Sequence, residues 1–106
     1  MARAIIHLPK SIKRGELVEI KAQALHVMET GFRRTQTGEQ VPRDIITRFA
    51  CSYNGNEVFS ADFYPSVAAN PFISFFLRAA DSGSIVCIWI GDNGFSVTET
   101  AFLSVG

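Results

Sequence analysis

The sequence predicts an all-β protein, an antiparallel β-sandwich of about seven strands that forms a single domain over residues 1–106. Three observations support this fold class. Short runs rich in Val, Ile, Phe and Thr are separated by glycine-containing turn signals at short intervals. No stretch shows a convincing helical pattern, and 106 residues make one ordinary domain. Short strands spaced in this way are typical of sandwiches and barrels.

Two strands are expected in the first quarter of the chain. Residues 4–8 form the first, which ends at Pro9 because proline cannot donate a hydrogen bond to a sheet ladder. Residues 16–25 alternate between apolar and polar side chains, so one face would be buried and the other would face water. The side chains expected in the core are Val18, Ile20, Ala22 and Ala24.

A hairpin is expected in the middle of the chain. Residues 45–53 and 56–63 are apolar at alternate positions, and Asn54-Gly55 lies between them. Asparagine and glycine tolerate the positive φ angles that both central positions of a tight hairpin turn require. We therefore expect these two runs to pair as antiparallel strands.

The last three strands are expected at residues 72–80, 84–90 and 95–105. Asp81-Ser82-Gly83 separates the first two of them, which predicts a second hairpin. Residues 64–71 contain Pro65 and Pro71 and suit a connection that crosses from one sheet to the other.

One long segment does not fit the strand pattern. Residues 24–35 compete as a helix, but Thr30-Gly31 interrupts the pattern. Residues 26–43 are instead expected to form a loop that is long for a sandwich, and long ordered loops often carry function.

The charge of the chain does not favour nucleic acid or an anionic membrane as a partner, because ten basic and ten acidic residues cancel. Residues 1–48 carry a net charge of +4 and residues 49–106 carry −4. Either the two halves compensate each other within the fold, or the first half carries a polar partner surface. The sequence contains no run of about 18 apolar residues that would span a membrane.

The first residues are too poor in apolar side chains for a secretory signal. Taken alone, this predicts a cytoplasmic protein, although export on the signal of a partner would remain open.

Cys51 and Cys87 lie within predicted strands among apolar residues such as Phe49 and Trp89. A nucleophilic cysteine needs a neighbouring cation or a helix N-terminus to lower its pKa, and neither is expected here. We interpret the two cysteines as small core residues, an inert thiol pair. Their separation would also permit a bond across the two sheets, as in immunoglobulin domains.

The histidines His7 and His26 do not make a metal site with the cysteines, because no short ligand spacing joins them. Iron-binding sandwiches that reduce superoxide use four His and one Cys, and this sequence has two His. No paired carboxylates or phosphate-binding loop stand out either. We therefore predict no catalytic residue, no cofactor and no metal. The alternative is a small Cys- or metal-dependent redox protein on the same fold.

Four arginines form a local basic stretch, and they can be interpreted in two ways. They lie on a solvated loop, or they form a docking or anion-steering patch. The residues are Arg33, Arg34, Arg43 and Arg48.

Several strings in this order resemble the SoxZ family. Residues 26–33 read His-Val-Met-Glu-Thr-Gly-Phe-Arg, similar to the His-Pro-Met-Glu-Thr-Gly-x-Arg string of that family, and Pro42-Arg43-Asp44-Ile45-Ile46 follows. Further matches are Asn54-Gly55 with Val58-Phe59, Ala69-Asn70-Pro71-Phe72, and Trp89 with Asp92-Asn93-Gly94. Val27 replaces the proline of the family string, and Phe72 stands where tyrosine is common.

The resemblance implies an immunoglobulin-like sandwich that forms a heterodimer with a SoxY-like carrier subunit. The carrier has a Gly-Gly-Cys-Gly-Gly tail whose cysteine holds sulfur intermediates, on which the enzymes and cytochromes of thiosulfate oxidation act. The SoxZ-like subunit would be non-catalytic. Its location would be the periplasm, reached by export with the partner.

A stable docking surface of this kind uses aromatic and arginine anchors. We expect the loop at residues 26–33 and the region of Phe72 to border the partner or its tail. An exposed docking face would also allow the isolated chain to form a homodimer. The residues predicted to bind the partner are His26, Met28, Phe32, Arg33, Phe72 and Phe76. An independent adhesion-type sandwich is a further alternative, since fold alone does not fix function.

Overall fold

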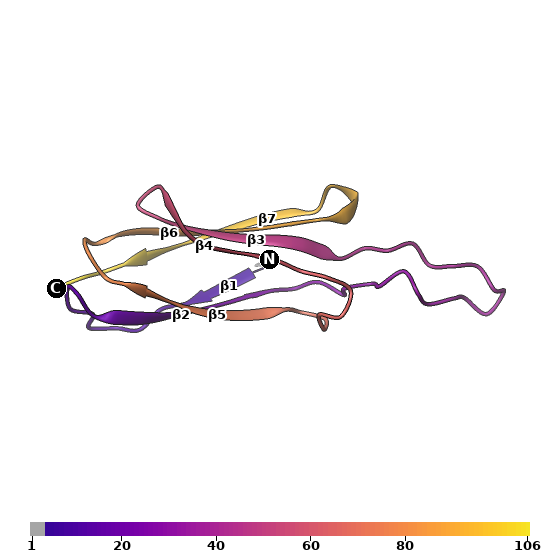
Figure 1. Ribbon diagram of the computed structural model, residues 1–106, viewed down its shortest axis with the longest axis horizontal. Helices are drawn as coiled ribbons and strands as arrows, with labels where there is room; N and C mark the ends of the chain where they lie inside the picture. The colour runs from indigo at the N-terminus through magenta and orange to yellow at the C-terminus, as the bar shows by residue number, and fades with distance from the viewer. Residues whose placement is uncertain (1–3) are drawn as a thin grey trace.

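The computed structural model describes residues 4–106 and confirms the all-β prediction (Figure 1). Two antiparallel sheets lie face to face as an immunoglobulin-like sandwich, one in the order β1-β2-β5 and the other in the order β4-β3-β6-β7. The strands are β1 (Ala4–His7), β2 (Leu17–Ala24), β3 (Ile46–Tyr53), β4 (Asn56–Asp62), β5 (Phe72–Arg78), β6 (Gly83–Gly91) and β7 (Ser96–Leu103).

Helical structure within residues 4–106 is limited to the single 3₁₀ turn η1 (Asp92–Gly94). No helix in this part of the chain is long and apolar enough to cross a membrane.

The local predictions from side-chain periodicity are confirmed. In β2, the residues at alternate positions from Val18 to Ala24 are buried, and Lys21 on the other face is exposed. β3 and β4 pair as the expected hairpin, and Asn54 and Gly55 have φ angles of 50° and 85° in the turn between them. Residues 64–71 carry the chain from β4 in one sheet to β5 in the other, as expected.

The second predicted hairpin, between residues 72–80 and 84–90, is wrong. β5 pairs with β2, whereas β6 pairs with β3 and β7 in the opposite sheet. Asp81 and Ser82 make a sharp connection, but it passes from one sheet to the other instead of closing a ladder. The crossing lets Phe75 and Leu77 of β5 enter the core from one sheet while Ile85 of β6 enters it from the other. Burial over the whole sandwich therefore decides the partner of each strand.

The suggestion that the two cysteines face each other across the sheets is also wrong. Cys51 and Cys87 lie on neighbouring strands of the same sheet, directly opposite each other in the pairing of β3 with β6. Both thiols are free and completely buried, as expected for small core residues.

Aromatic side chains from both sheets meet in the core. The rings of Phe59 and Phe75 stack with centroids 4.5 Å apart and an interplanar angle of 4°, which joins β4 to β5 across the sandwich. Phe49 packs against Trp89 at 5.0 Å and against Phe75 at 5.9 Å. Pairs of this kind stabilise a core by about 0.5–1.5 kcal/mol beyond the burial of their surface.

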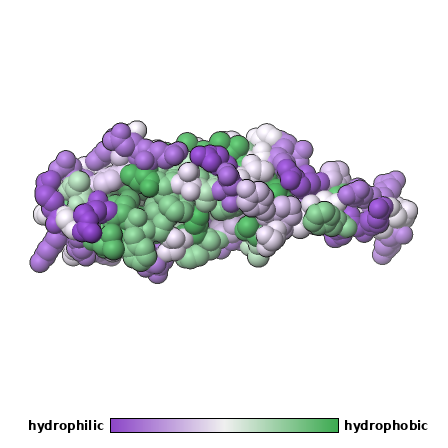
Figure 2. Space-filling model, viewed as in Figure 1, coloured by the Kyte–Doolittle hydropathy of each residue, from purple (hydrophilic) through white to green (hydrophobic). Residues whose placement is uncertain are grey.

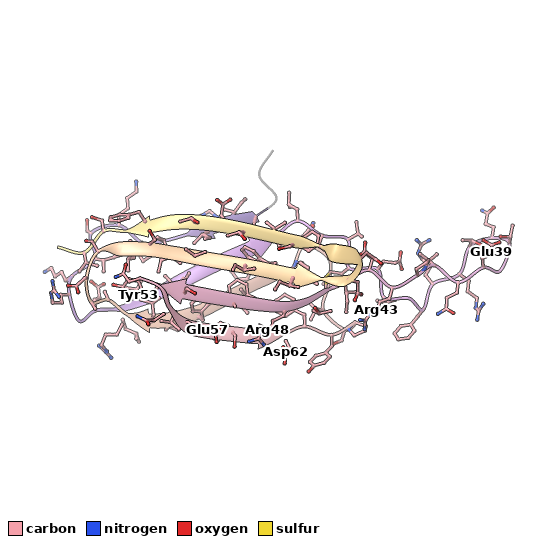
Figure 3. All side chains as sticks on the ribbon, turned by 90° about the horizontal axis from the view of Figure 1, so that it is seen from above. Glu39, Arg43, Arg48, Tyr53, Glu57 and Asp62 are labelled. Carbon is pink, nitrogen blue, oxygen red and sulfur yellow. The ribbon has the colours of Figure 1, made fainter. Side chains whose placement is uncertain are left out.

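Tyr53 provides a polar connection between the sheets at the end of the sandwich remote from Arg43 and Glu39 (Figure 3). Its hydroxyl donates to the carbonyl oxygen of Asp81 and accepts from the backbone N–H of Ala80 at 3.1 Å. The residue itself is buried at the end of β3.

We predict that Tyr53→Phe lowers the free energy of unfolding by about 1–2 kcal/mol, because it leaves two part-buried backbone groups without their partner. Urea denaturation would measure the loss. Tyr64→Phe is the matched control, since Tyr64 is exposed, and it should change stability by less than about 0.5 kcal/mol. Equal effects of the two substitutions would contradict the role assigned to Tyr53.

Candidate partner-binding surfaces

The long segment between β2 and β3 forms an extended two-stranded arm, which we define as residues 26–44. Glu29 and Asp44 exchange two backbone hydrogen bonds of 2.8 Å, and the N–H of Val41 donates to the carbonyl oxygen of Arg33 at 2.9 Å. The arm projects from one end of the sandwich and stretches the molecule to 59 × 24 × 20 Å (Figure 1). Its surface is mostly hydrophilic, in contrast to the hydrophobic side chains gathered on the body (Figure 2).

Asp92 in η1 anchors the base of the arm. Its carboxylate accepts two hydrogen bonds from the Arg43 guanidinium, at 2.8 and 2.9 Å, and one from the N–H of Ile45 at 3.1 Å. The hydrogen bonds from Arg43, then that from Ile45, hold the pKa of Asp92 below its ordinary value. The side chain of Asn93 adds a longer contact of 3.4 Å to the carbonyl oxygen of Arg43.

His26 and Met28 support the arm from inside. The His26 side chain is only 5% exposed, and its Nδ1 accepts from the N–H of Met28 at 2.9 Å. Its Nε2 lies 3.6 Å from Asp44, and its ring meets the ring of Phe95 edge to face at 4.7 Å. The sulfur of Met28 is 3.3 Å from the N–H of Ile46 at the start of β3.

Gly31 lets the two sides of the arm approach each other. Its φ angle is 88°, and a Cβ atom at this position would lie 2.9 Å from the Cβ of Arg43. Together with the buried His26 and Met28, this glycine shows that the string at residues 26–33 sets the local geometry of the arm.

Phe32 and Arg33 face outward from the arm. Phe32 is 78% exposed, and Arg33 donates two hydrogen bonds to Glu29, at 2.7 and 3.1 Å. The basic stretch does not act as one patch, because three of its arginines have separate carboxylate partners. These pairs are Arg33 with Glu29, Arg43 with Asp92, and Arg48 with Asp62, the last between the inner strand β3 and the edge strand β4 (Figure 3).

Phe72 and Phe76 project from the outer face of β5 and are 57% and 60% exposed. Asn70, just before β5, joins this region to the arm, because its side chain accepts from the N–H of His26 at 2.9 Å and its own N–H donates to the carbonyl oxygen of His26. Of the six residues predicted to bind the partner, all but Phe76 therefore lie at one end of the sandwich. Phe76 lies further along β5.

The sequence interpretation missed an apolar surface on the four-stranded sheet. In β6, Ile85, Cys87 and Trp89 face the core, so the alternate residues Val86, Ile88 and Ile90 face outward. No further layer of residues 4–106 lies over this face (Figure 3). The unbroken apolar run at residues 85–90 is the signal that could have revealed it, since a strand that reads apolar throughout is typically covered on both faces.

The neighbours of β6 add no charge beside Val86 and Ile88, whereas Arg48 of β3 lies opposite Ile90. Ala50 and Ser52 of β3 and Thr98 and Thr100 of β7 lie beside Ile88 and Val86 in the ladder. We define the β6 outer face as the outward residues Ala50, Ser52, Val86, Ile88, Ile90, Thr98 and Thr100. A sheet face with an apolar centre and its charges toward the edge suits contact with another sheet.

Within the described part of the chain, the ionisable residues do not assemble a recognisable metal site. Residues 4–106 contain no group of three or more His, Cys, Asp and Glu side chains arranged to hold an ion. The other histidine, His7, lines an open hollow of about 250 Å³ with Leu8, Pro9, Glu19 and Lys21.

A comparison with protein families decides the affiliation of the chain. The family described as "Sulphur oxidation protein SoxZ" matches residues 6–101. The chain belongs to the SoxZ family. Membership gives this SoxZ-family chain a role in the sulphur oxidation system and confirms the resemblance seen in the sequence. No curated protein matches the sequence.

Solved structures resemble this SoxZ-family fold at low sequence identity. A superoxide reductase (neelaredoxin) from Ignicoccus hospitalis aligns with a TM-score of 0.78 and 15% identity, over 99% of this chain and 81% of that one. The sulfur carrier protein SoxY from Chlorobium limicola f thiosulfatophilum aligns with a TM-score of 0.71 and 15% identity, over 100% of this chain and 81% of that one. At such identity the likeness shows the fold and not the activity.

We predict that the acid stability of the arm depends on Asp92. Because its pKa is lowered in the folded chain, the unfolded chain takes up the proton first as the pH falls. The stabilising contribution is therefore present above the ordinary carboxyl pKa of about 3.9 and is lost as the pH falls through the lower folded value. Asp92→Asn should remove this part of the pH dependence in denaturant titrations at successive pH values.

Asp62→Asn is the matched control, because Asp62 pairs with Arg48 away from the arm. At acidic pH, the free energy of unfolding of Asp62→Asn should change with pH as it does in the wild type. A wild-type loss of stability at acidic pH in Asp92→Asn would contradict the anchoring role.

Proposed function

We propose that the chain is the non-catalytic partner subunit of a sulfur-carrier heterodimer in thiosulfate oxidation. Its partner is a SoxY-like subunit whose tail cysteine holds the sulfur intermediates. The observation that carries this proposal is the uncovered β6 outer face on a chain of the SoxZ family. A subunit with this surface can hold a second protein without any chemistry of its own.

The SoxY structure has a fold that aligns with the whole length of this chain, so each of the two subunits would offer sheet faces for contact. Two sandwiches can stack sheet on sheet with about 10 Å between the layers. A stable contact needs at least about 1,000 Å² of buried surface, which a whole sheet face can supply. Val86 and Ile88 would form its apolar centre, and Ile90 would lie beside Arg48. The pair of Arg48 with Asp62 would lie at its polar rim.

The arm and the adjoining aromatic residues are assigned a second role, which is to border the tail of the carrier. The arm is held rigidly at its base by Asp92 and His26, so it can present Phe32 and Arg33 at a fixed position beyond the sheets. Phe72 and Phe76 continue this surface onto β5. Enzymes and cytochromes of the pathway would reach the tail sulfur on this side of the complex.

A division of labour explains why the subunit would have no group of its own that reacts with the sulfur intermediates. A sulfur-bearing tail must move between several active sites, so it benefits from a rigid base. Cys51 and Cys87 are completely buried, which keeps their thiols away from sulfur compounds in solution. The alternative of a redox enzyme rests on fold similarity to superoxide reductases, and fold similarity alone does not carry function.

The proposed location is the periplasm, reached by export together with the carrier subunit. The assignment rests on family membership. Fractionation of cells that express both subunits, or this chain alone, would test it. We expect periplasmic recovery only when the carrier is present, and recovery in the cytoplasm under both conditions would contradict the proposal.

We predict that Ile88→Lys weakens binding to a SoxY-like carrier at least about 10-fold, because it places a charge at the centre of the apolar contact. Calorimetric titration of the two purified subunits would measure the affinity. Phe72→Ala and Phe32→Ala should leave the affinity within about 3-fold but slow the turnover of sulfur on the carrier.

Lys21→Gln on the outer face of β2 is the control and should change neither quantity, and all variants must keep the circular dichroism spectrum of the wild type. Wild-type affinity in Ile88→Lys would overturn the assignment of the docking face. Failure of the wild-type chain to bind any SoxY-like carrier would overturn the proposed function itself.

A further inference from the structure

The two cysteines are placed where a covalent bond can join them. Cys51 and Cys87 are opposite each other on adjacent antiparallel strands, and both side chains enter the core. Residues opposite each other in such a pair have Cα atoms about 4.5–5.5 Å apart. Disulfides join residues whose Cα atoms are about 4.4–6.8 Å apart, so the register of β3 and β6 already satisfies this requirement.

The surroundings favour the neutral thiol of Cys87. The interaction with Cys51, followed by burial, raises the pKa of Cys87 above its ordinary value, and the negative charge of Glu99 adds to the rise. Glu99 is opposite Cys87 on β7, and Phe59 is opposite Cys51 on β4, so one row across the sheet contains the thiols and their neighbours. A thiolate of Cys87 is disfavoured there, whereas a dithiol and a disulfide are both uncharged.

We propose that Cys51 and Cys87 form a redox site, in which a cross-strand disulfide closes when the chain folds in the presence of a disulfide oxidant. Burial then preserves the form that the pair acquired during folding, either the dithiol or the disulfide. Neither thiol has exposed surface, so reagents reach the folded pair only when β3 and β6 separate. The proposal does not depend on the identity of the partner subunit.

The reaction is a thiol–disulfide exchange in two steps. The Cys51 thiolate of the unfolded chain attacks one sulfur of the oxidant, for example glutathione disulfide, and one glutathione thiolate leaves. As β3 and β6 begin to pair, and before the core closes over them, the thiolate of Cys87 attacks the Cys51 sulfur of the mixed disulfide and the second glutathione leaves. The chain loses two protons and two electrons, and the oxidant is reduced to two glutathione molecules.

The test is oxidative refolding of the full-length chain. Reduced, denatured protein is refolded in a buffer of glutathione and glutathione disulfide, then denatured with iodoacetamide and weighed by intact mass spectrometry. The expected product folds with the native circular dichroism spectrum, is lighter by two hydrogen atoms and takes up no alkyl group. Cys51→Ala and Cys87→Ala are the controls, and each should keep one thiol that is alkylated or bound to one glutathione.

A second measurement tests the preservation of the redox state. Chain folded under reducing conditions and then exposed to the same oxidant should keep both thiols, and should form the disulfide only after denaturant is added and removed. Natively folded wild type that emerges from oxidative refolding with two alkylated thiols, or with glutathione attached, would overturn the proposal. A disulfide that forms only in protein without the native spectrum would overturn it equally. Rapid oxidation of the folded, reduced chain would overturn the claim that burial preserves its state.

Discussion

The antiparallel pairing of β3 with β6 is the constraint on which the rest of this structure depends. It sets Phe49 beside Trp89 in the core and Cys51 beside Cys87. Because the side chains of a strand alternate, the same register turns Ile88 outward at the centre of the sheet. A slip of one residue would exchange the core face of β6 with its outer face. The core, the thiol pair and the proposed docking surface are therefore consequences of one ladder.

The same ladder also fixes the arm. Gly91 ends β6 opposite Ile46, and a Cβ atom on this glycine would lie 2.5 Å from the carbonyl oxygen of Ile45. This close approach brings the next residue, Asp92, under the arm, where it binds Arg43. A projecting segment with few core contacts would otherwise lose much conformational entropy on ordering. Charged hydrogen bonds at its base offset part of that cost, and they leave the exposed residues of the arm free for a partner.

Sequence reasoning succeeded where local patterns determine the outcome. Strand positions could be predicted from the alternation of residues such as Val18 and Ile20. The Asn54-Gly55 turn could be predicted because both residue types tolerate the positive φ angles that the structure shows there. It failed where distant segments compete for the same partner. The Asp81-Ser82 connection looks like a hairpin turn locally, yet burial of Phe75 against the opposite sheet sends β5 to pair with β2.

The candidate site could be predicted only in part, because it too depends on contacts between segments that are distant in the sequence. Family strings drew attention to His26 and Met28, but their burial depends on Asp44 and Ile46, which become neighbours only when the arm folds back. The β6 outer face was missed because the apolar run at residues 85–90 has no alternation that would separate an inward from an outward side. Its outward half becomes visible only once Trp89 and Cys87 are known to face inward.

Native mass spectrometry of the chain co-expressed with a SoxY-like carrier, under conditions of thiosulfate oxidation, tests the central claim most directly. The account predicts a heterodimer whose sulfur adducts are confined to the carrier subunit, while this chain keeps an unmodified mass or one lighter by two hydrogen atoms. Sulfur adducts on this chain, or two subunits that do not associate, would contradict it.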